Sequence, residues 1–243
     1  MVNSVYLTLM QGLFPQQCLL CGLPSHNPLP LCAGCKGDLQ ANKHCCSRCA
    51  LPLAGSPAHP GAPLCGHCLQ QPPPFDRVIA PWLYDEMLAY LIHRWKFQRE
   101  QRLTALLAQL WLCHDQPLGS IDMLVPVPLH WRRQWWRGFN QSQLLCRALR
   151  SACPELATLP IQARAISRRH ATAAQSGINA RQRARNLQGA FTVRKPCDNL
   201  RVAVVDDVLT TGATAAAVAR ELRTAGACHI EIWCLARTPA PTH

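Results

Sequence analysis

Short apolar runs alternate with longer amphipathic stretches from residue 77 to residue 234. The short runs are rich in β-branched residues and predict strands, whereas apolar residues that recur at helical spacing predict helices. The predicted strands cover residues 77–83, 122–127, 161–166, 190–193, 202–205 and 230–234, and the predicted helices cover residues 85–99, 103–113 and 140–152, with a fourth after residue 214. Strands that alternate with helices indicate an α/β fold, a mostly parallel sheet with helices on both faces.

The segment 70–74 reads Gln-Gln-Pro-Pro-Pro and predicts a stiff linker, because consecutive prolines favour polyproline II and exclude helix. It divides the chain into two predicted domains, a small module over residues 1–70 and the α/β domain over residues 76–240. A chain of 243 residues can bury a full core and leave room for such a module. The Pro- and Gly-rich stretch 51–63 could not form a packed core alone, which favours metal cross-links in the small module.

Nine of the 15 cysteines lie between residues 18 and 68, and most of these form Cys-x-x-Cys pairs: Cys18/Cys21, Cys32/Cys35, Cys46/Cys49 and Cys65/Cys68. Two such pairs complete a closed tetrahedral site of four thiolates, the arrangement of structural zinc, so we expect two zinc ions. Disulfides or redox dithiols are the alternatives, but a redox motif needs one pair rather than four in tandem. The spacing allows sequential or cross-braced pairing, and it leaves Cys45 as an alternate ligand or a free thiol.

The charge and hydropathy of the chain restrict its location and partners. No run of about 18 apolar residues occurs, so no membrane-spanning helix is predicted, and the N-terminus lacks the basic flank and cleavage site of a secretory signal. We therefore expect a cytoplasmic protein. The formal net charge is +12, and residues 131–195 hold 13 Lys and Arg against one acid, Glu155. Such a field attracts a pyrophosphate or a nucleic-acid backbone, although a solvated basic surface without a partner explains the charge equally well.

The segment 202–214, Val-Ala-Val-Val-Asp-Asp-Val-Leu-Thr-Thr-Gly-Ala-Thr, carries the clearest chemistry. Its strand places Asp206 and Asp207 at a carboxyl end, where open α/β sheets bind ligands, and these carboxylates suit ribose hydroxyls or a hydrated Mg²⁺. The predicted helix that follows residue 214 would present its N-terminus to a ligand, and a helix N-terminus favours a phosphate. The loop before that helix consists of Thr210, Thr211, Gly212, Ala213 and Thr214. The acids could merely end a strand and the loop merely cap a helix, but the order of the whole string favours a sugar-phosphate site.

The predicted loop 126–137 mixes cations with aromatic residues. Its arginines are Arg132, Arg133 and Arg137, whose guanidinium forks suit phosphate oxygens but could also be solvated. Its indoles are Trp131, Trp135 and Trp136, which could stack on the bases of a single strand. We expect the indoles instead to pack against the sheet or the zinc module, because buried tryptophan is an ordinary core anchor.

Three segments and the cysteine pairs together resemble a known family. Residues 202–214 look like the phosphoribosyl pyrophosphate (PRPP) motif of type I phosphoribosyltransferases. The other segments are Val125-Pro-Val-Pro-Leu-His130 with Arg137-Gly-Phe-Asn-Gln-Ser142, and residues 175–191 with Arg181, Asn186 and Gly189-Ala-Phe191. With the Cys-x-x-Cys pairs, these are similar to the ComF family, most closely to its GntX branch of DNA-utilisation proteins. The resemblance covers nearly the whole chain.

This resemblance implies a type I phosphoribosyltransferase-like domain joined to a double zinc ribbon. The implied ligand is PRPP or a related ribose phosphate with Mg²⁺, held by Asp206 and Asp207 at the ribose hydroxyls and by residues 210–214 at the 5′-phosphate. If the protein is an enzyme, a nucleophile displaces pyrophosphate at ribose C1, and Arg137 and Arg168 neutralise the leaving pyrophosphate. Arg168 belongs to the segment 164–185, which resembles the mobile loop that covers PRPP in type I enzymes. The acceptor is not identified by any motif.

The family also implies a role in processing imported single-stranded DNA, for transformation or as a nutrient. The expected partners are then single-stranded DNA and proteins of DNA uptake or DNA processing. An alternative from a different functional class is a non-catalytic protein that binds single-stranded DNA and retains a vestigial PRPP site.

Overall fold

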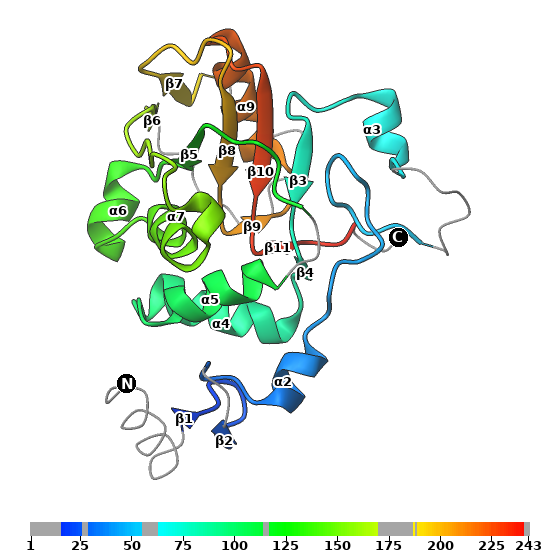
Figure 1. The fold of residues 1–243 in the computed structure, drawn as a ribbon, viewed down its shortest axis with the longest axis vertical. Coiled ribbons are helices and arrows are strands. Elements are labelled where there is room, and N and C mark those ends of the chain that lie inside the picture. Colours follow the sequence, from blue (N-terminus) through cyan, green and yellow to red (C-terminus); the bar gives the residue numbers. More distant parts are fainter. Residues whose placement is uncertain are drawn as a thin grey trace.

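The chain is described by a computed structural model over residues 16–25, 29–54, 63–113, 117–169, 187 and 189–240 (Figure 1). Its largest sheet has four parallel strands in the order β3 (Arg77–Ile79), β10 (His229–Trp233), β8 (Arg201–Val205) and β5 (Met123–Pro126). A small cysteine-rich module precedes this sheet in the chain. The predicted fold class, a mostly parallel α/β sheet with an N-terminal cysteine module, is confirmed.

Three of these strands stop and then resume in a second, smaller sheet. The resumed strands are β4 (Trp82–Leu83), β11 (Ala236–Arg237) and β9 (Val208–Leu209), which pair in parallel in the order β4-β11-β9. The predicted strand 77–83 is therefore two strands, and Pro81 lies in the interruption, where it cannot donate a ladder hydrogen bond. Along β8 and β9 the interruption falls on Asp206 and Asp207.

Helices cover both faces of the large sheet (Figure 1). One face carries α4 (Glu86–Phe97), α5 (Leu103–Leu112) and α7 (Gln141–Ala152), and the other carries α9 (Ala213–Thr224). Alternate residues of a strand point to opposite faces, so Ala203 and Val205 enter the α4–α5–α7 core, whereas Val202 and Val204 enter the α9 core. All four predicted helices are confirmed, and α4 buries one apolar face formed by Leu88, Leu91, Ile92 and Trp95.

Two predictions about local structure are wrong. The segment 161–166 is not a continuous strand: Ile161 forms one isolated parallel bridge with Leu124, and Ala165 N then donates to Gln162 O at 3.1 Å and closes a turn. The chain pairs again as β6 (Ile166–Arg168) against β7 (Phe191–Val193) in a separate antiparallel sheet. The predicted loop 126–137 contains the helix α6 (Trp131–Arg137). The His130 side chain caps its first turn, and Gly138 ends it in the left-handed conformation with φ of 83°.

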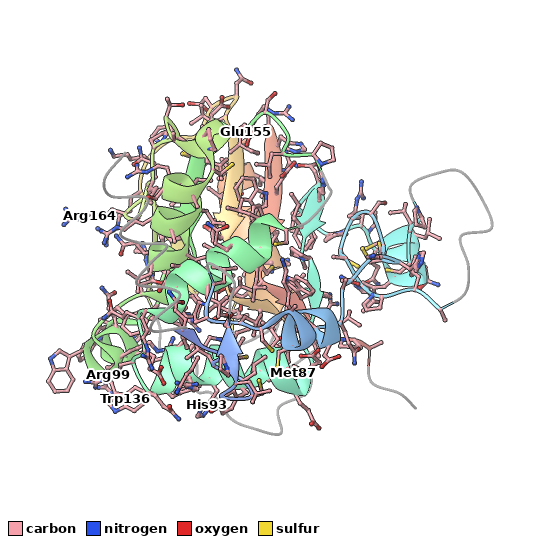
Figure 2. The ribbon with its side chains drawn as sticks, turned by 60° about the horizontal axis from the view of Figure 1, so that its bottom comes forward. Met87, His93, Arg99, Trp136, Glu155 and Arg164 are labelled. Atoms are coloured by element: carbon pink, nitrogen blue, oxygen red, sulfur yellow. The ribbon has the colours of Figure 1, made fainter. Side chains whose placement is uncertain are left out.

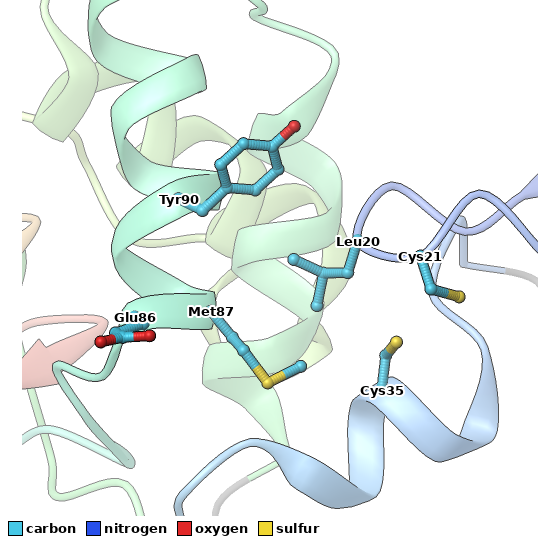
Figure 3. Close-up of a pocket in the computed structure, with 6 residues that line it drawn as sticks. All are labelled: Leu20, Cys21, Cys35, Glu86, Met87 and Tyr90. Carbon is cyan, nitrogen blue, oxygen red and sulfur yellow. The ribbon is translucent and has the colours of Figure 1, made fainter.

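The N-terminal module contains β1 (Gln16–Gln17), β2 (Pro24–Ser25), α2 (Ala33–Asp38) and α3 (Gly66–Gln70). Its first part packs on α4, where Arg94 Nη1 donates to Leu19 O at 3.1 Å. An open pocket of about 390 Å³ lies along this contact. Figure 3 shows Met87 and Tyr90 of α4 on one side of this pocket and Leu20, Cys21 and Cys35 of the module on the other. None of the helices in the described ranges has the length and apolar character that crossing a membrane requires.

Candidate functional site

Asp206 and Asp207 lie where β8 gives way to β9, at the carboxyl ends of the large parallel sheet. Backbone hydrogen bonds fix both residues: Asp206 N donates to Trp233 O, and Leu235 N donates to Asp207 O, each at 2.9 Å. The two acids therefore occupy rigid positions between the two sheets. This is the edge of an α/β sheet at which ligands bind.

Asp207 is buried and surrounded by donors from two helices. The ammonium of Lys96, in the last turn of α4, forms an ion pair with Asp207 Oδ2. Gln141, the first residue of α7, donates from Nε2 to the same oxygen at 3.2 Å, and it accepts from Arg137 Nη1 at 2.5 Å. Asp207 Oδ1 accepts from Val208 N at 2.7 Å. Both carboxylate oxygens of Asp207 are thus occupied by the protein itself.

Asp206 differs from Asp207 in its hydrogen bonds and in its pKa. Ser142 Oγ donates to its Oδ1 at 3.2 Å, and Asp207 N donates to the same oxygen at 2.9 Å. Burial and the neighbouring Asp207 carboxylate raise the pKa of Asp206 from 3.8 to about 7, although the Asp207 amide and the Lys96 charge partly oppose this rise. Since both of its hydrogen bonds within the described part of the chain go to Oδ1, the oxygen Oδ2 is left for a ligand.

The two predicted pyrophosphate arginines approach the acids from different elements. Arg137 ends α6 and is buried, with its guanidinium carbon 5.3 Å from the centre of the Phe97 ring. Arg168 ends β6 and stacks over Phe191 at 5.5 Å. Burial lowers the pKa of both side chains; the charge of Asp207 opposes this for Arg137, and the charge of Asp206 does so for Arg168. The structure therefore brings Asp206, Asp207, Arg137 and Arg168 into one electrostatic cluster.

Residues 210–214, here called the phosphate loop after the role predicted for them from the sequence, lead directly into α9. Gly212 is the N-cap of this helix with φ of 77°, a conformation that other residues adopt only with strain. The first backbone hydrogen bond of the helix runs from Ala216 N to Gly212 O at 2.8 Å, so the amides before residue 216 have no helical partner. Thr211 Oγ1 accepts from Ala213 N at 3.4 Å. Thr210 and Thr211 are exposed to solvent, as an anion site requires.

The eight predicted zinc ligands form two clusters, each made from consecutive pairs: Cys18, Cys21, Cys32 and Cys35 in the first, and Cys46, Cys49, Cys65 and Cys68 in the second. Sulfurs from different pairs lie 3.7 Å apart for Cys21 and Cys32 and 3.6 Å apart for Cys49 and Cys65. Four sulfurs about 2.3 Å from a tetrahedral zinc would lie about 3.8 Å from one another, so both clusters fit the ion.

The clusters also settle the two points that spacing left open. Pairing is sequential in both, and Cys45 lies outside the second cluster, in an isolated bridge with Pro52. Burial opposes ionisation of the Cys18 thiol, but hydrogen bonds from the amides of Cys21 and Cys32 outweigh it and lower its pKa to about 6. A thiol with a lowered pKa is ready to bind a metal as thiolate.

The packing expected for the three tryptophans of α6 is wrong. Trp131, Trp135 and Trp136 are 64%, 84% and 54% exposed. Arg132 lies 5.2 Å from the Trp131 ring and Arg99 lies 6.0 Å from the Trp136 ring, and Figure 2 shows Arg99 and Trp136 at the same outer corner of the molecule. The helix turns its indoles outward because its last residue, Arg137, is the one that enters the interior.

Other expected contributors can be placed only in part. The segment with Gln175, Arg181 and Asn186 lies outside the described residues. Sequence reasoning did not assign three neighbours of the acids, namely Lys96, Gln141 and Ser142. Gln141 and Ser142 stand in the segment 137–142 that the family resemblance had already marked, which was the available signal.

Comparison with known proteins adds independent findings. Residues 9–73 match the family of double zinc ribbon domains. The chain is 39% identical over 233 residues to the DNA utilization protein YhgH of Salmonella typhimurium. The matched region covers 92% of this chain and 98% of that protein. Over 231 residues it is 37% identical to YhgH of Escherichia coli K12, with the same coverage. It is 34% identical over 224 residues to Competence protein F of Haemophilus influenzae, covering 85% of this chain and 96% of that one.

Among solved structures, a purine phosphoribosyltransferase from Pyrococcus horikoshii has 16% identity and a TM-score of 0.29, covering 66% of this chain and 77% of its own. A hypoxanthine phosphoribosyltransferase from Staphylococcus aureus has 14% identity and a TM-score of 0.30, covering 59% of this chain and 70% of its own. These scores are low, so the function of the site has to be argued from its own residues.

Proposed function

The chain belongs to the ComF family of competence and DNA-utilisation proteins, and from this premise we propose that it binds PRPP or a related ribose phosphate with Mg²⁺. We propose further that it acts in the uptake or use of single-stranded DNA. The observation that carries the first proposal is the convergence of four groups at one sheet edge: the acidic pair, the phosphate loop, Arg137 and Arg168. The narrower GntX placement and the cytoplasmic location stay predictions.

Each part of a ribose phosphate has a chemical counterpart in this cluster. Asp206 offers a carboxylate oxygen. This oxygen can accept a hydrogen bond from a ribose hydroxyl, or it can bind hydrated Mg²⁺, which prefers oxygen ligands. The phosphate loop offers helix N-terminal amides to the 5′-phosphate. Arg137 Nε is buried and has no hydrogen-bond partner among the described residues, so a pyrophosphate oxygen would satisfy it.

Bound Mg²⁺ would supply positive charge to the pyrophosphate, while the residues of this chain orient the ligand. The ion pair with Lys96 holds Asp207 in place, and Asp207 in turn holds Gln141 beside Arg137. In this arrangement Asp207 acts on the ligand through its neighbours, whereas Asp206 contacts it. The site would thus bind and orient PRPP whether or not turnover follows.

The deciding experiment is calorimetric titration of zinc-loaded protein with PRPP, with and without Mg²⁺, followed by addition of a panel of bases while pyrophosphate release is measured. We expect binding that requires Mg²⁺ and is lost in Asp206→Asn. Pyrophosphate release with one base would make the protein a phosphoribosyltransferase. Absence of PRPP binding by folded protein, or wild-type affinity in Asp206→Asn, would refute the site.

The exposed indoles favour a second activity, the binding of single-stranded DNA along α6. Trp131 and Trp135 present flat apolar faces to solvent beside Arg132, the combination that stacks bases while neutralising phosphates. Arg137 is buried and would take no part in it. Three exposed indoles on one short helix mark an interaction surface.

Titration of a fluorescent oligothymidylate at several salt concentrations tests this activity. If roughly five cations meet phosphates, the slope of log affinity against log salt is about −3.5. Arg132→Ala should make the slope less steep by about 0.7, whereas Trp135→Ala should lower affinity with little change in slope, because stacking releases no counterions. Arg220→Ala, an exposed arginine on α9, is the matched control. A slope near zero, or equal losses in Arg220→Ala and Arg132→Ala, would show that α6 does not bind the strand.

A further inference from the structure

Arg237, the last residue of β11, carries a guanidinium into the interior between the small sheet and the N-terminal module. The residue is 8% exposed. It donates to four main-chain carbonyls, those of Cys49 at 3.2 Å, Leu209 at 3.0 Å, Thr238 at 2.7 Å and Thr210. No ion pair within the described ranges includes it. Its contacts are therefore directed at backbone positions rather than at a charged partner.

Three of these carbonyls, all but that of the adjacent Thr238, belong to two places that are far apart in the sequence. Cys49 is a member of the second cysteine cluster, whereas Leu209 and Thr210 form the end of β9 and the start of the phosphate loop. A guanidinium is planar and donates in fixed directions, so one side chain can hold both backbones in a set relation. A lysine would offer a single point of donation and could not reproduce this.

Few other hydrogen bonds hold the phosphate loop in the described part of the chain. Within the loop, Thr211 Oγ1 accepts from Ala213 N at 3.4 Å, and before it Thr238 N donates to Leu209 O at 3.0 Å. Thr238 follows Arg237 directly, so its backbone N–H and the Arg237 side chain both donate to Leu209 O, and the side chain alone also donates to Thr210 O. The order of the loop depends on this end of β11.

We infer that Arg237 is a positioning residue that fastens the phosphate loop to the second cysteine cluster, so that metal occupancy of this cluster sets the order of the loop and its affinity for a phosphate. The claim about phosphate affinity, below called the affinity clause, rests on the proposed function. The claim that Arg237 fastens the loop does not. Four sulfurs bound to one ion hold the Cys46–Cys49 turn rigid and with it the Cys49 carbonyl. Without the ion, the Cys49 carbonyl that accepts from Arg237 is free to move.

The fastening is tested without ligand by hydrogen exchange of zinc-loaded protein, read on peptides that span residues 205–216. Arg237→Met should raise exchange there about tenfold, as the loss of one or two charge-assisted hydrogen bonds implies. Arg223→Met is the matched control, because Arg223 also donates to main-chain carbonyls, those of Ala227 and Cys228, but at the opposite end of the sheet. Unchanged exchange in Arg237→Met, or an equal rise in Arg223→Met, would overturn the inference.

The metal clause is tested by comparing the two clusters in the same exchange measurement. Cys65→Ser with Cys68→Ser should loosen residues 205–216, whereas Cys32→Ser with Cys35→Ser should leave them protected. If either double variant fails to fold, zinc release from wild type and Arg237→Met by a chromogenic chelator replaces it, and we expect faster release of one of the two ions in Arg237→Met. Equal loosening by both cluster variants, or unchanged release kinetics, would refute the coupling.

Calorimetry with PRPP and Mg²⁺ then tests the affinity clause. We expect about tenfold weaker binding in Arg237→Met and wild-type affinity in Arg223→Met, because only the former loosens the loop. If wild-type protein binds no PRPP while exchange still rises in Arg237→Met, the proposed function and the affinity clause fail and the fastening stands. Wild-type affinity in Arg237→Met would remove the affinity clause alone.

Discussion

Replacing the two neighbouring aspartates by asparagine, one at a time, should change stability in opposite directions. In the ligand-free protein, burial and Asp207 disfavour the ionised form of Asp206, whereas the Asp207 carboxylate is stabilised by its ion pair with Lys96. Asp206→Asn removes an unfavourable charge, and Asp207→Asn strands the Lys96 ammonium, which is 17% exposed. We therefore expect the first variant to be more stable than wild type at neutral pH and the second to be less stable.

The magnitudes follow from the same contacts. A rise of the Asp206 pKa from 3.8 to about 7 corresponds to an upper limit of about 4 kcal/mol at about 1.4 kcal/mol per unit. Asp206 keeps part of its surface in water and titrates together with Asp207, so we expect about 1–2 kcal/mol of stabilisation in Asp206→Asn. Breaking a buried ion pair from one side costs about 3 kcal/mol, which is the loss expected in Asp207→Asn.

The pH dependence has a definite sign. The folded protein binds the Asp206 proton more tightly than the unfolded chain, so stability from this group is fully present below about pH 4, falls as the pH rises towards 7 and is constant above. The gain in Asp206→Asn should therefore be larger at about pH 8 than at about pH 5.5. Urea unfolding of zinc-saturated protein, followed by the fluorescence of the buried Trp95, Trp111 and Trp233, measures the differences at matched pH. Equal destabilisation of both variants, or a gain in stability of Asp206→Asn that does not change with pH, would show that the protein does not stabilise the two carboxylates differently.

Three further results are expected. Native mass spectrometry should show two zinc ions per chain, and Cys45→Ser should keep both, because Cys45 lies outside the second cluster; one ion or none would reject the two-site arrangement. Gly212→Ala should cost about 1 kcal/mol in thermal unfolding, because its φ of 77° strains any residue with a Cβ, and an unchanged melting temperature would contradict the left-handed cap. Lys96→Met should shift PRPP binding to higher pH, because the Lys96 charge lowers the Asp206 pKa; an unmoved pH profile would separate Lys96 from the acidic pair.

The sequence predicted those features that depend on local pattern. The strand before Asp206, the helices and the cysteine pairs follow from periodicity and fixed spacing, and the structure reproduces them. The outward turn of α6 could not be foreseen, because which side of a short helix is buried depends on partners distant in sequence, here Phe97 under the Arg137 guanidinium. The unequal states of Asp206 and Asp207 were hidden for the same reason, since the cation that separates them, Lys96, lies more than a hundred residues earlier. The division into domains at residues 70 and 76, the Mg²⁺ and the DNA partners stay predictions.

The helix α4 has a consequence for any attempt to cut the protein into working pieces. Its Arg94 donates to Leu19 of the cysteine module, and two residues later Lys96 reaches Asp207. Cys18, Leu31 and Leu39 of the module belong to the same hydrophobic core as Leu91 and Trp95. A fragment that begins at residue 76 would retain every strand of the large sheet and still expose one side of its own interior. Because the helix that loses its cover is also the one whose Lys96 pairs with Asp207, truncation would disturb the proposed ribose-phosphate site without removing one of its residues.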